Sequence, residues 1–477
     1  MKKQNNAYPF LKSLNLESDV ERRLTNHLNR IVEGNDSIYR TPFAEDGRAE
    51  LVQANLDAVF KAKSVLINST LNDLELDNRS KFGARSIALP WSERKDKLLE
   101  NFEDFKISGK LVKDIVPSRL GLRPLSLASA LKLLKNDTNS GLPFYIRKGK
   151  IKERVLNNFD DYISRRDPCI LFTRTQESKK TRDVWGFPIA DTLNEMKYYS
   201  PLLQFQKNQN YRAALLGPEV VGRHVCELVI KCRKHGWILV SIDFASYDKT
   251  VKRLLQSLAF RYIKGLFQSQ FHSEIDYIQE RFSTIGIVTP DGVLNGPHGV
   301  PSGSTFTNEV DSLVQMILAL QLPFVKIENC QIQGDDAVYL IPDGCDSELY
   351  NQFKSFGLSV NESKSYKSKD FAVFLQCLYH IDYIDKGIFG GIYPIYRALN
   401  RICFQERWSD FEDFDMSGRD YYSIRTLCIL ENCKYHPLFE DFVRLIATSD
   451  KYNLDFSSQG LSNYVRMLET AQGTGGV

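Results

Sequence analysis

The sequence predicts an α+β fold in which helices pack against an antiparallel sheet. Three observations lead to this class. Residues 237–243 form a short β-branched run, two turn signals are each flanked by extended apolar pieces, and helical periodicity surrounds them. Between residues 236 and 356 the predicted order is strand, helix, hairpin, helix, hairpin, helix, which is typical of this fold class.

The first half of the chain is expected to be mainly helical and then irregular. Apolar residues recur at helical spacing over residues 14–32 and 50–67. Glycine and proline become more frequent from 121 to 143, which indicates irregular structure rather than a linker. The run WILVSID then predicts a buried strand.

The centre of the chain alternates helices with hairpins. Residues 249–267 place their leucines and Ile263 on one helical face. The triplet Pro290-Asp291-Gly292 is a strong turn signal and predicts a hairpin. The expected elements after it are a buried helix at 305–320, a second hairpin at 329–341 and a short helix at 347–356.

Composition excludes few classes of protein. The chain has 477 residues, 43% hydrophobic and 25% charged, with a formal net charge of +3, which are ordinary values for a large globular protein. The N-terminus is basic but no apolar run follows it, so no signal peptide is expected. The longest apolar stretch, 313–325, is too short to span a bilayer, so we expect no membrane association.

Two carboxylates flank the end of the predicted strand. Asp243 ends the strand, and Asp248 follows five positions later where the next helix begins. A helix cap is the plainer interpretation of Asp248, since aspartate suits the first turn of a helix.

A second acidic site lies in the second hairpin. Asp335 and Asp336 are adjacent on the predicted turn, where two carboxylates repel unless a cation is present. Hard oxygen ligands suit Mg²⁺ or Mn²⁺. The alternative is an ordinary surface turn, for which Gly-Asp is a common choice.

A loop of small residues precedes the buried helix. Ser302 and Gly303 lie in this loop, where small side chains allow close approach of a ligand. Thr307 and Asp311 are four residues apart and share one helical face. The alternative is an ordinary helix start capped by Ser302 or Ser304.

Together, Asp-x4-Asp, SG-x3-T and GDD, in this order and spacing, resemble the palm of viral RNA-dependent RNA polymerases. The wording GVPSGSTFTNEVDS is most similar to the polymerases of partitiviruses, with picobirnaviruses second. The resemblance implies a right-hand fold of fingers, palm and thumb. It implies an N-terminal extension plus fingers over 1–235, a palm over 236–380 with a fingers insertion near 265–298, and a thumb with a C-terminal tail over 381–477.

The resemblance also implies roles for individual residues. Two Mg²⁺ ions, or Mn²⁺, would be held by Asp243, Asp335, Asp336 and the carbonyl of Phe244. Lys364 would protonate the leaving pyrophosphate, with Lys367 and Lys369 as nearby rivals. The segment KKTRDVWGFPI resembles the nucleotide channel and NDTNSGLPF the template guide. The implied nucleotide-binding residues are Arg174, Lys180, Arg182, Asp248, Ser302, Gly303, Thr307 and Asp311, and the implied template-binding residues are Asn139, Ser140, Gly141 and Pro143.

The sequence departs from the family at one position. Many positive-strand virus polymerases have asparagine where this chain has Asp311. A carboxylate that only accepts cannot make all the hydrogen bonds of an amide. We therefore expect either a protonated carboxyl or a bridging water between Asp248 and Asp311.

The implied partners are an RNA template and product, ribonucleoside triphosphates and the viral capsid protein, in the virion interior and the host cytoplasm. Two other interpretations remain open. One is a metal-dependent nuclease or reverse transcriptase that uses the same carboxylates. The other is a viral RNA-packaging or structural protein without enzymatic activity.

Overall fold

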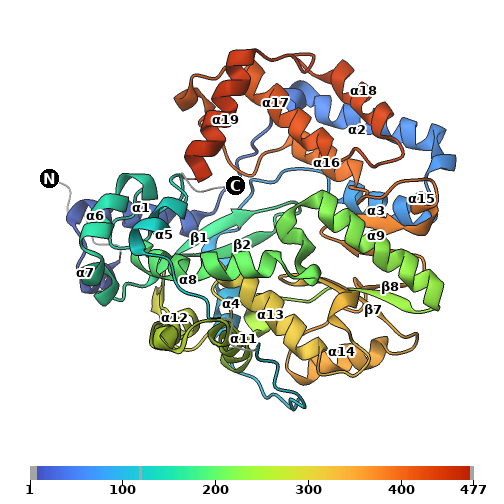
Figure 1. The fold of residues 1–477 in the computed structure, drawn as a ribbon. Coiled ribbons are helices and arrows are strands. Elements are labelled where there is room, and N and C mark those ends of the chain that lie inside the picture. Colours follow the sequence, from blue (N-terminus) through green and yellow to red (C-terminus); the bar gives the residue numbers. More distant parts are fainter. Residues whose placement is uncertain (1–7, 118–120, 473–477) are drawn as a thin grey trace.

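The computed structural model describes residues 8–117 and 121–472, and its fold is α+β as predicted (Figure 1). A four-stranded antiparallel sheet in the order β6-β7-β3-β8 lies at the centre of the chain. Its strands are β3 (Ile238–Ile242), β6 (Cys330–Gln333), β7 (Asp336–Ile341) and β8 (Tyr366–Ser368).

Helices cover both faces of this central sheet. Side chains alternate along a strand, so Val240 and Ile242 enter one hydrophobic cluster while Leu239 enters another. The first cluster contains α11 (Arg253–Leu266), α13 (Thr307–Ala319) and α14 (Asp346–Ser355), and the second contains α9 (Pro218–His235).

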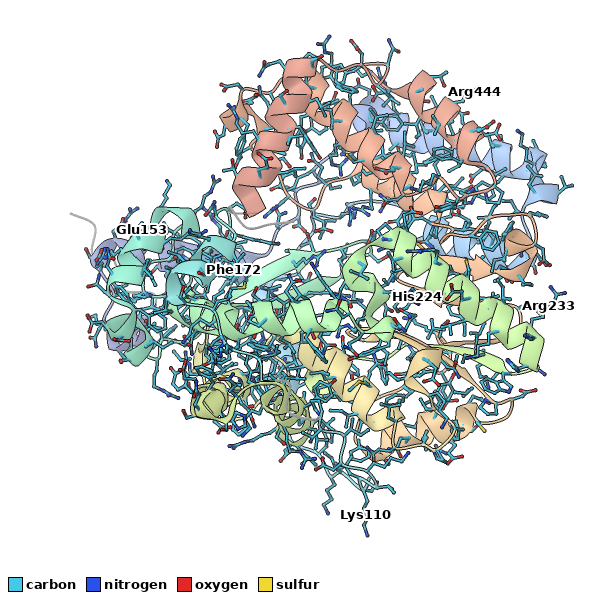
Figure 2. All side chains as sticks on the ribbon, viewed as in Figure 1. Lys110, Glu153, Phe172, His224, Arg233 and Arg444 are labelled. Atoms are coloured by element: carbon cyan, nitrogen blue, oxygen red, sulfur yellow. The ribbon has the colours of Figure 1, made fainter. Side chains whose placement is uncertain are left out.

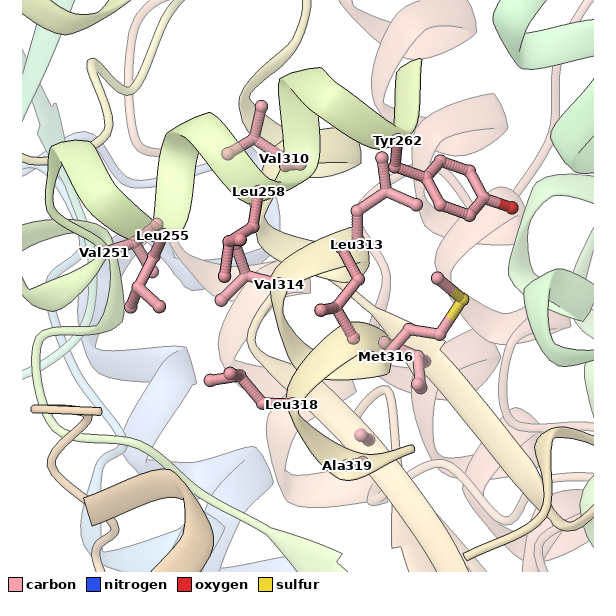
Figure 3. Packing of buried hydrophobic residues seen from close by; sticks show 14 of the residues in the cluster. Val251, Leu255, Leu258, Tyr262, Val310, Leu313, Val314, Met316, Leu318 and Ala319 are labelled. Atoms are coloured by element: carbon pink, nitrogen blue, oxygen red, sulfur yellow. The ribbon is translucent and has the colours of Figure 1, made fainter. Parts of the chain in front are cut away.

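Helices α11 and α13 pack directly against each other. Figure 3 shows Leu255, Leu258 and Tyr262 of α11 beside Val310 and Leu313 of α13. All of these side chains are buried, so α13 is fixed between the sheet and α11.

A second sheet, in the order β2-β1-β4-β5, receives the hairpin predicted at 290–292. Its strands are β1 (Cys169–Thr175), β2 (Thr181–Gly186), β4 (Ile287–Thr289) and β5 (Gly292–Leu294). Strands β1 and β4 pair in parallel across more than a hundred residues of sequence. This long-range pairing had no local signal, because β4 is only three residues long.

The N-terminal helices lie beside the C-terminal third of the chain (Figure 1). Helices α2 (Arg48–Ala62) and α3 (Ser69–Ser80) pack against α16 (Ile395–Cys403), and α2 also packs against α18 (Phe439–Ser449). Helix α1 (Ser18–Glu33) instead shares a hydrophobic cluster with the second sheet. Residues 8–90 therefore connect two distant parts of the molecule.

The remaining elements complete the two ends of the molecule. One loop projects from the body, with Lys110 near its tip (Figure 2), and its backbone is anchored where the Gly109 amide donates to the Ser355 carbonyl at 2.8 Å. The other helices and strands are α4 (Trp91–Leu99), α5 (Leu127–Leu133), α6 (Lys152–Asn157), α7 (Phe159–Ser164), α8 (Ile189–Lys207), α12 (His272–Thr284), β9 (Phe371–Phe374), β10 (Cys377–His380), α15 (Ile381–Ile384), α17 (Gly418–Glu431) and α19 (Ser458–Gln472).

The helix predicted as continuous over 249–267 is broken. It consists of α10 (Tyr247–Thr250) and α11, with an extended Lys252 between them. The Lys252 ammonium donates to the Asn101 carbonyl at 2.7 Å, and Gln256 donates to the Val251 carbonyl at 2.9 Å. These contacts with side chains and with a remote segment replace helical hydrogen bonds, which periodicity alone could not reveal.

Within residues 8–117 and 121–472, no helix has the length and apolar character needed to cross a bilayer.

Candidate active site

The pairing of β3 with β7 brings the two acidic sites together. Ile242 pairs with Ala337, so Asp243 and Asp336, one residue beyond this pair, lie opposite each other across two adjacent strands. Facing residues on antiparallel strands are about 5 Å apart. Asp335 occupies the turn itself and is exposed, whereas Asp243 and Asp336 are half-buried.

Neighbouring negative charges disfavour the ionisation of Asp243 and Asp336. Burial raises the pKa of Asp336 to about 7, and the charges of Asp335 and Asp243 act in the same direction. Burial also raises the pKa of Asp243, where the charges of Lys364 and Lys180 act in the opposite direction. Three carboxylates whose charges are mutually unfavourable form a site that a cation would stabilise.

The same carboxylates do not enclose a metal on their own. Across the described residues, no three His, Cys, Asp or Glu side chains converge closely enough to hold an ion. This arrangement still fits Mg²⁺, which commonly takes only one or two carboxylates and fills its shell with water and substrate phosphates. Asp243, Asp335 and Asp336 therefore fit the metal that the sequence predicts.

Two residues that the sequence did not predict hold Asp243. The Asp243 amide donates to the Ser365 hydroxyl at 3.0 Å, and the Asn361 amide donates to the Asp243 carbonyl at 2.8 Å. Burial raises the pKa of the Asp243 carboxyl, and a hydrogen bond from the Asn361 side chain offsets part of that rise. Both residues lie more than a hundred positions away in sequence, so only the fold connects them with Asp243.

Lys364 acts on the carboxylates more directly than its two rivals. Burial raises the pKa of Asp243, and the charge of Lys364 offsets part of that rise. Lys367 is instead paired with Asp346 at 2.8 Å, and Lys369 with Asp343 at 2.5 Å. The ion pairs of these rivals favour Lys364 as the lysine that acts at the site.

Asp248 lies in a polar cluster with Ser302 and Asp311, two other residues predicted to bind the nucleotide. The Ser302 hydroxyl donates a hydrogen bond to the Asp248 carboxylate, and the Val300 amide donates to the Asp248 carbonyl at 2.7 Å. Asp248 lies in the first turn of α10, as the plainer interpretation predicts, but α10 begins without a side-chain cap.

Asp311 faces Asp248 from inside the protein. It is only 3% exposed, and its Oδ1 has no hydrogen-bond partner among the described residues. Burial raises its pKa well above the ordinary value, and the negative charges of Asp248 and Asp335 raise it further. Of the two expectations for this pair, the electrostatics favour a protonated Asp311 that donates to Asp248.

Thr307 closes the small-residue loop on itself. Its hydroxyl donates to the Pro301 carbonyl at 3.1 Å and accepts from the Gly303 amide at 3.4 Å. Neither Ser302 nor Ser304 caps α13, whose first turn follows Phe306 without a side-chain cap.

The predicted nucleotide channel is the hairpin of β1 and β2. Arg174 and Arg182 are direct cross-strand partners, and both are exposed. Like charges directly opposite each other destabilise a sheet, so this pair suits an anionic ligand. Arg174 lies 3.6 Å from the carboxylate of Glu406, and the positive charges of Arg182 and Lys364 contribute to a lowered pKa at Lys180, after burial.

The hairpin also touches the small-residue loop. The Trp185 amide donates to the Ser302 carbonyl at 3.0 Å. A Cβ atom on Gly303 would lie 2.0 Å from the Trp185 carbonyl oxygen, so only glycine allows this contact. The fold thus joins the predicted nucleotide channel to the polar cluster around Asp248.

The predicted template-binding residues lie in a compact turn. Asn139 accepts a hydrogen bond from the Gly141 amide at 2.8 Å. Ser140 and Gly141 are buried, and the Ser140 carbonyl accepts from the Ile189 amide at 2.8 Å. Of the predicted residues only Asn139 and Pro143, both half-buried, retain surface that RNA could reach.

Glu195 is a further residue that the sequence did not predict. Its buried carboxylate accepts hydrogen bonds from the Ser304 hydroxyl at 2.7 Å and from the amide and hydroxyl of Thr305 at 2.9 and 2.8 Å. Burial raises its pKa to about 7 despite these bonds. It anchors the small-residue loop to α8, and no sequence spacing connects it with that loop.

The chain is similar to known viral polymerases. Residues 109–386 match the family described as viral RNA-dependent RNA polymerase, which is more than half of the chain. The chain is 28% identical to a potential RNA-dependent RNA polymerase of human picobirnavirus, over 91% of this chain and 86% of that protein. It is 24% identical to an RNA-directed RNA polymerase of Cryptosporidium parvum virus 1, over 52% of this chain and 53% of that protein.

Solved structures resemble the whole fold. The RNA-dependent RNA polymerase of a human picobirnavirus superimposes with a TM-score of 0.76 at 25% identity, over 93% of this chain and 89% of that chain. A deletion mutant of that enzyme lacking its insertion loop gives the same TM-score and identity, over 94% and 93%.

Proposed function

The chain belongs to the family of viral RNA-dependent RNA polymerases, and we propose that Asp243, Asp335 and Asp336 form its reaction centre. It is an RNA-directed RNA polymerase of a picobirnavirus-like double-stranded RNA virus. Of the two virus groups named from sequence, the long relative and the solved structures favour the second, picobirnaviruses, over partitiviruses. The observation that carries the proposed centre is the β3–β7 register, which sets Asp243 opposite Asp336.

We propose that the carboxylates hold two Mg²⁺ ions, with Mn²⁺ as the alternative. Asp243, Asp335 and Asp336, together with the Phe244 carbonyl, would hold the ions. When bound, the metals make the 3′-hydroxyl nucleophilic and stabilise the pyrophosphate leaving group. Burial, and then the charges of Asp335 and Asp243, raise the pKa of Asp336, and a bound cation would favour its charged form, which supports this role.

The exposed arginine pair of the β1–β2 hairpin would bind the triphosphate. Arg174 and Arg182 face the same side of the sheet, and Lys180 lies in the turn between them. Charge-assisted hydrogen bonds to phosphate would offset the repulsion between the two guanidinium groups. Lys364 would then donate a proton to the leaving pyrophosphate as a general acid.

The cluster around Asp248 would select ribonucleotides. The ribose 2′-hydroxyl both donates and accepts, so it suits a site with a carboxylate acceptor and a hydroxyl partner. Asp248 and Ser302, both half-buried, would supply these groups, and the buried Asp311 would support them.

The arrangement of the sheets supports the proposed division into fingers, palm and thumb. The central sheet lies within the palm proposed for 236–380, and the insertion near 265–298 joins the β1–β2 sheet of the fingers. RNA template and product would be held by their phosphates and thus bind in a salt-sensitive manner. We also propose that the viral capsid protein is a partner. The polymerase would act in the virion interior and the host cytoplasm.

RNA synthesis by purified protein tests the reaction centre. With labelled ribonucleotides, an RNA template and Mg²⁺ or Mn²⁺, Asp335→Ala should lose synthesis by about 10³-fold or more, since metal stabilisation is worth several kcal/mol. The matched control is Asp385→Ala, which removes an exposed carboxylate paired with Arg233. Full synthesis by Asp335→Ala would mean that the proposed reaction centre is wrong.

The same assay separates the other interpretations. Degradation of the template without incorporation would indicate a nuclease, and preference for deoxynucleotides would indicate a reverse transcriptase. Tight RNA binding without incorporation under any metal would indicate a packaging protein.

A further inference from the structure

Two side chains of helix α13, Ser312 and Gln315, bind the backbone of the turn that carries Asp335. The Gln315 amide group donates to the Gly334 carbonyl at 2.7 Å. The Gly334 amide donates to the Ser312 hydroxyl at 2.8 Å. Both side chains are completely buried, and Gly334 directly precedes Asp335.

The side-chain polar atoms of Ser312 and Gln315 are all hydrogen-bonded. The Ser312 hydroxyl donates to the Asn308 carbonyl at 2.7 Å, so its oxygen remains free to accept from Gly334. The Gln315 oxygen accepts from the Tyr339 hydroxyl at 2.9 Å, which turns the amide nitrogen toward Gly334. Burying two polar side chains in a core helix is costly unless each is hydrogen-bonded, so these residues are built for their contacts.

Only glycine fits at position 334, between the turn and helix α13. Its φ of +66° lies in the left-handed region, and a Cβ atom would meet the Asn308 side chain at 2.9 Å. Asn308 is itself held by the Arg212 guanidinium at 3.1 Å, and Arg212 forms a buried ion pair with Glu309 at 2.6 Å. The position of the turn is thus fixed against α13, and α13 is fixed against the 3₁₀ segment Asn210–Leu216.

We propose that Ser312 and Gln315 are positioning residues that set where the Asp335 carboxylate meets the metals. The proposal rests on the proposed function, since it gives these residues their purpose. Ser312 is the last residue of the segment GVPSGSTFTNEVDS but has no role predicted from the sequence, and Gln315 lies beyond that segment. The Asp335 side chain is exposed, so the protein core holds this turn through the buried neighbour Gly334. A displacement of about 1 Å at a reacting centre can cost about 10²-fold in rate.

Metal binding provides a direct test. Residues that orient metal ligands typically contribute about 10- to 100-fold in metal affinity or activity. Gln315→Met and Ser312→Ala should each weaken Mn²⁺ binding to the full chain by about 10-fold, measured from the electron paramagnetic resonance of free Mn²⁺. The value of kcat for RNA synthesis should fall by about 10- to 100-fold while KM for the nucleotide changes by less than about threefold.

Gln331→Met is the matched control. Gln331 is also a buried glutamine with both amide atoms bonded, and it lies on β6, which leads into the same turn. Its bonds go to the backbone of Asn210 and Ala213 rather than to Gly334. This variant should share any loss of thermal stability but keep its Mn²⁺ affinity.

Two outcomes would overturn the proposal. One is a change in Mn²⁺ affinity for Gln315→Met and Ser312→Ala no larger than that for Gln331→Met. The other is a failure of Ser312→Thr, which keeps the hydroxyl, to recover more kcat than Ser312→Ala. If Gln315→Met folds poorly, Ser312→Ala carries the test, because it deletes one oxygen atom.

The failure of this proposal is distinguishable from failure of the proposed function. If Asp335→Ala abolishes RNA synthesis while Gln315→Met and Ser312→Ala retain normal metal affinity, only the positioning role is wrong. If Asp335→Ala remains active, the reaction centre itself is wrong.

Discussion

Asp311 is a carboxyl group whose surroundings disfavour its charge. It is buried, and the nearest charges that act on it are the carboxylates of Asp248 and Asp335. A neutral carboxyl can donate a hydrogen bond as an amide does. This would allow an aspartate to stand where many positive-strand virus polymerases have asparagine.

Replacement of Asp311 by asparagine should therefore be mild. Asp311→Asn keeps the shape and a hydrogen-bond donor, so RNA synthesis at neutral pH should stay within about threefold of the original, a cost below about 1 kcal/mol. Asp311→Leu, which also fills the space but cannot donate, should lose discrimination between ribonucleotides and deoxyribonucleotides. Competition between the two nucleotide types on one template measures this ratio. Equal losses in both variants would show that Asp311 acts as an anion.

Glu195 should make stability depend on pH. Its pKa is about 7 in the folded protein against an ordinary value of 4.5. Between these values the folded chain retains a proton that the unfolded chain releases, so the contribution of Glu195 to stability falls as pH rises from about 4.5 to 7. Above that range the loss is complete and constant.

The variant Glu195→Gln cannot titrate, so it isolates this effect. Its free energy of unfolding relative to the original should improve by about 3 kcal/mol between pH 4.5 and pH 7.5, whatever the fixed cost of the altered hydrogen bonds. Urea denaturation followed by tryptophan fluorescence at both pH values gives the difference. A difference that does not change with pH would show that Glu195 is ionised throughout.

The loop between residues 300 and 306 is the element on which the site converges. It receives contacts from β2 through Trp185, from α8 through Glu195 and from α10 through Asp248. Each contact comes from a different part of the fold, so the shape of the loop is set by its neighbours rather than by its own sequence.

Gly303→Ala tests how closely the loop is held. The added Cβ atom would lie 2.0 Å from the Trp185 carbonyl, so β2 and the loop must separate. Gly344→Ala is the control, since that glycine also has a positive φ but an added Cβ atom there would have no neighbour within 4 Å. Gly303→Ala should be about 2 kcal/mol less stable than Gly344→Ala and should lose RNA synthesis. Equal stabilities in thermal unfolding would mean that the loop moves freely.

At the scale of the whole molecule, Arg85 joins three segments that are distant in sequence. It is 8% exposed and contacts Glu177 at 3.1 Å, in the turn of the β1–β2 hairpin, and Glu406 at 2.6 Å, beyond α16. Glu406 in turn approaches Arg174 of the hairpin. One arginine of the N-terminal region thus links the proposed fingers to the proposed thumb.

Arg85→Met should loosen this link while preserving much of the side-chain volume. It leaves two partly buried carboxylates without their cation, at a cost of about 2 kcal/mol after allowance for their exposure to solvent. Arg233→Met, which breaks an exposed pair with Asp385, should cost less than about 0.5 kcal/mol. Urea denaturation compares the two, and limited proteolysis should cleave near residue 406 faster in Arg85→Met. Equal stability of the two variants would contradict a linking role.

The sequence by itself determined the fold class, the enzyme family and most of the central elements. Strand β3, both hairpins and helix α13 carry strong local patterns, because turn residues and hydrophobic periodicity act over a few neighbouring residues. The predicted carboxylates Asp243, Asp335 and Asp336 could be identified because the order and spacing of three motifs is specific. Their catalytic roles stay predictions that the proposed assays test.

Only the tertiary structure decided which residues support that site. The contacts of Glu195, Arg85, Asn361 and Gln315 each join segments that have no fixed spacing in sequence, and the parallel pairing of β1 with β4 is of the same kind. Such contacts depend on how elements pack, which a local pattern does not encode. The three aspartates are visible in the sequence because the order and spacing of their motifs is specific, whereas the side chains that contact them and their loops are visible only once the chain has folded.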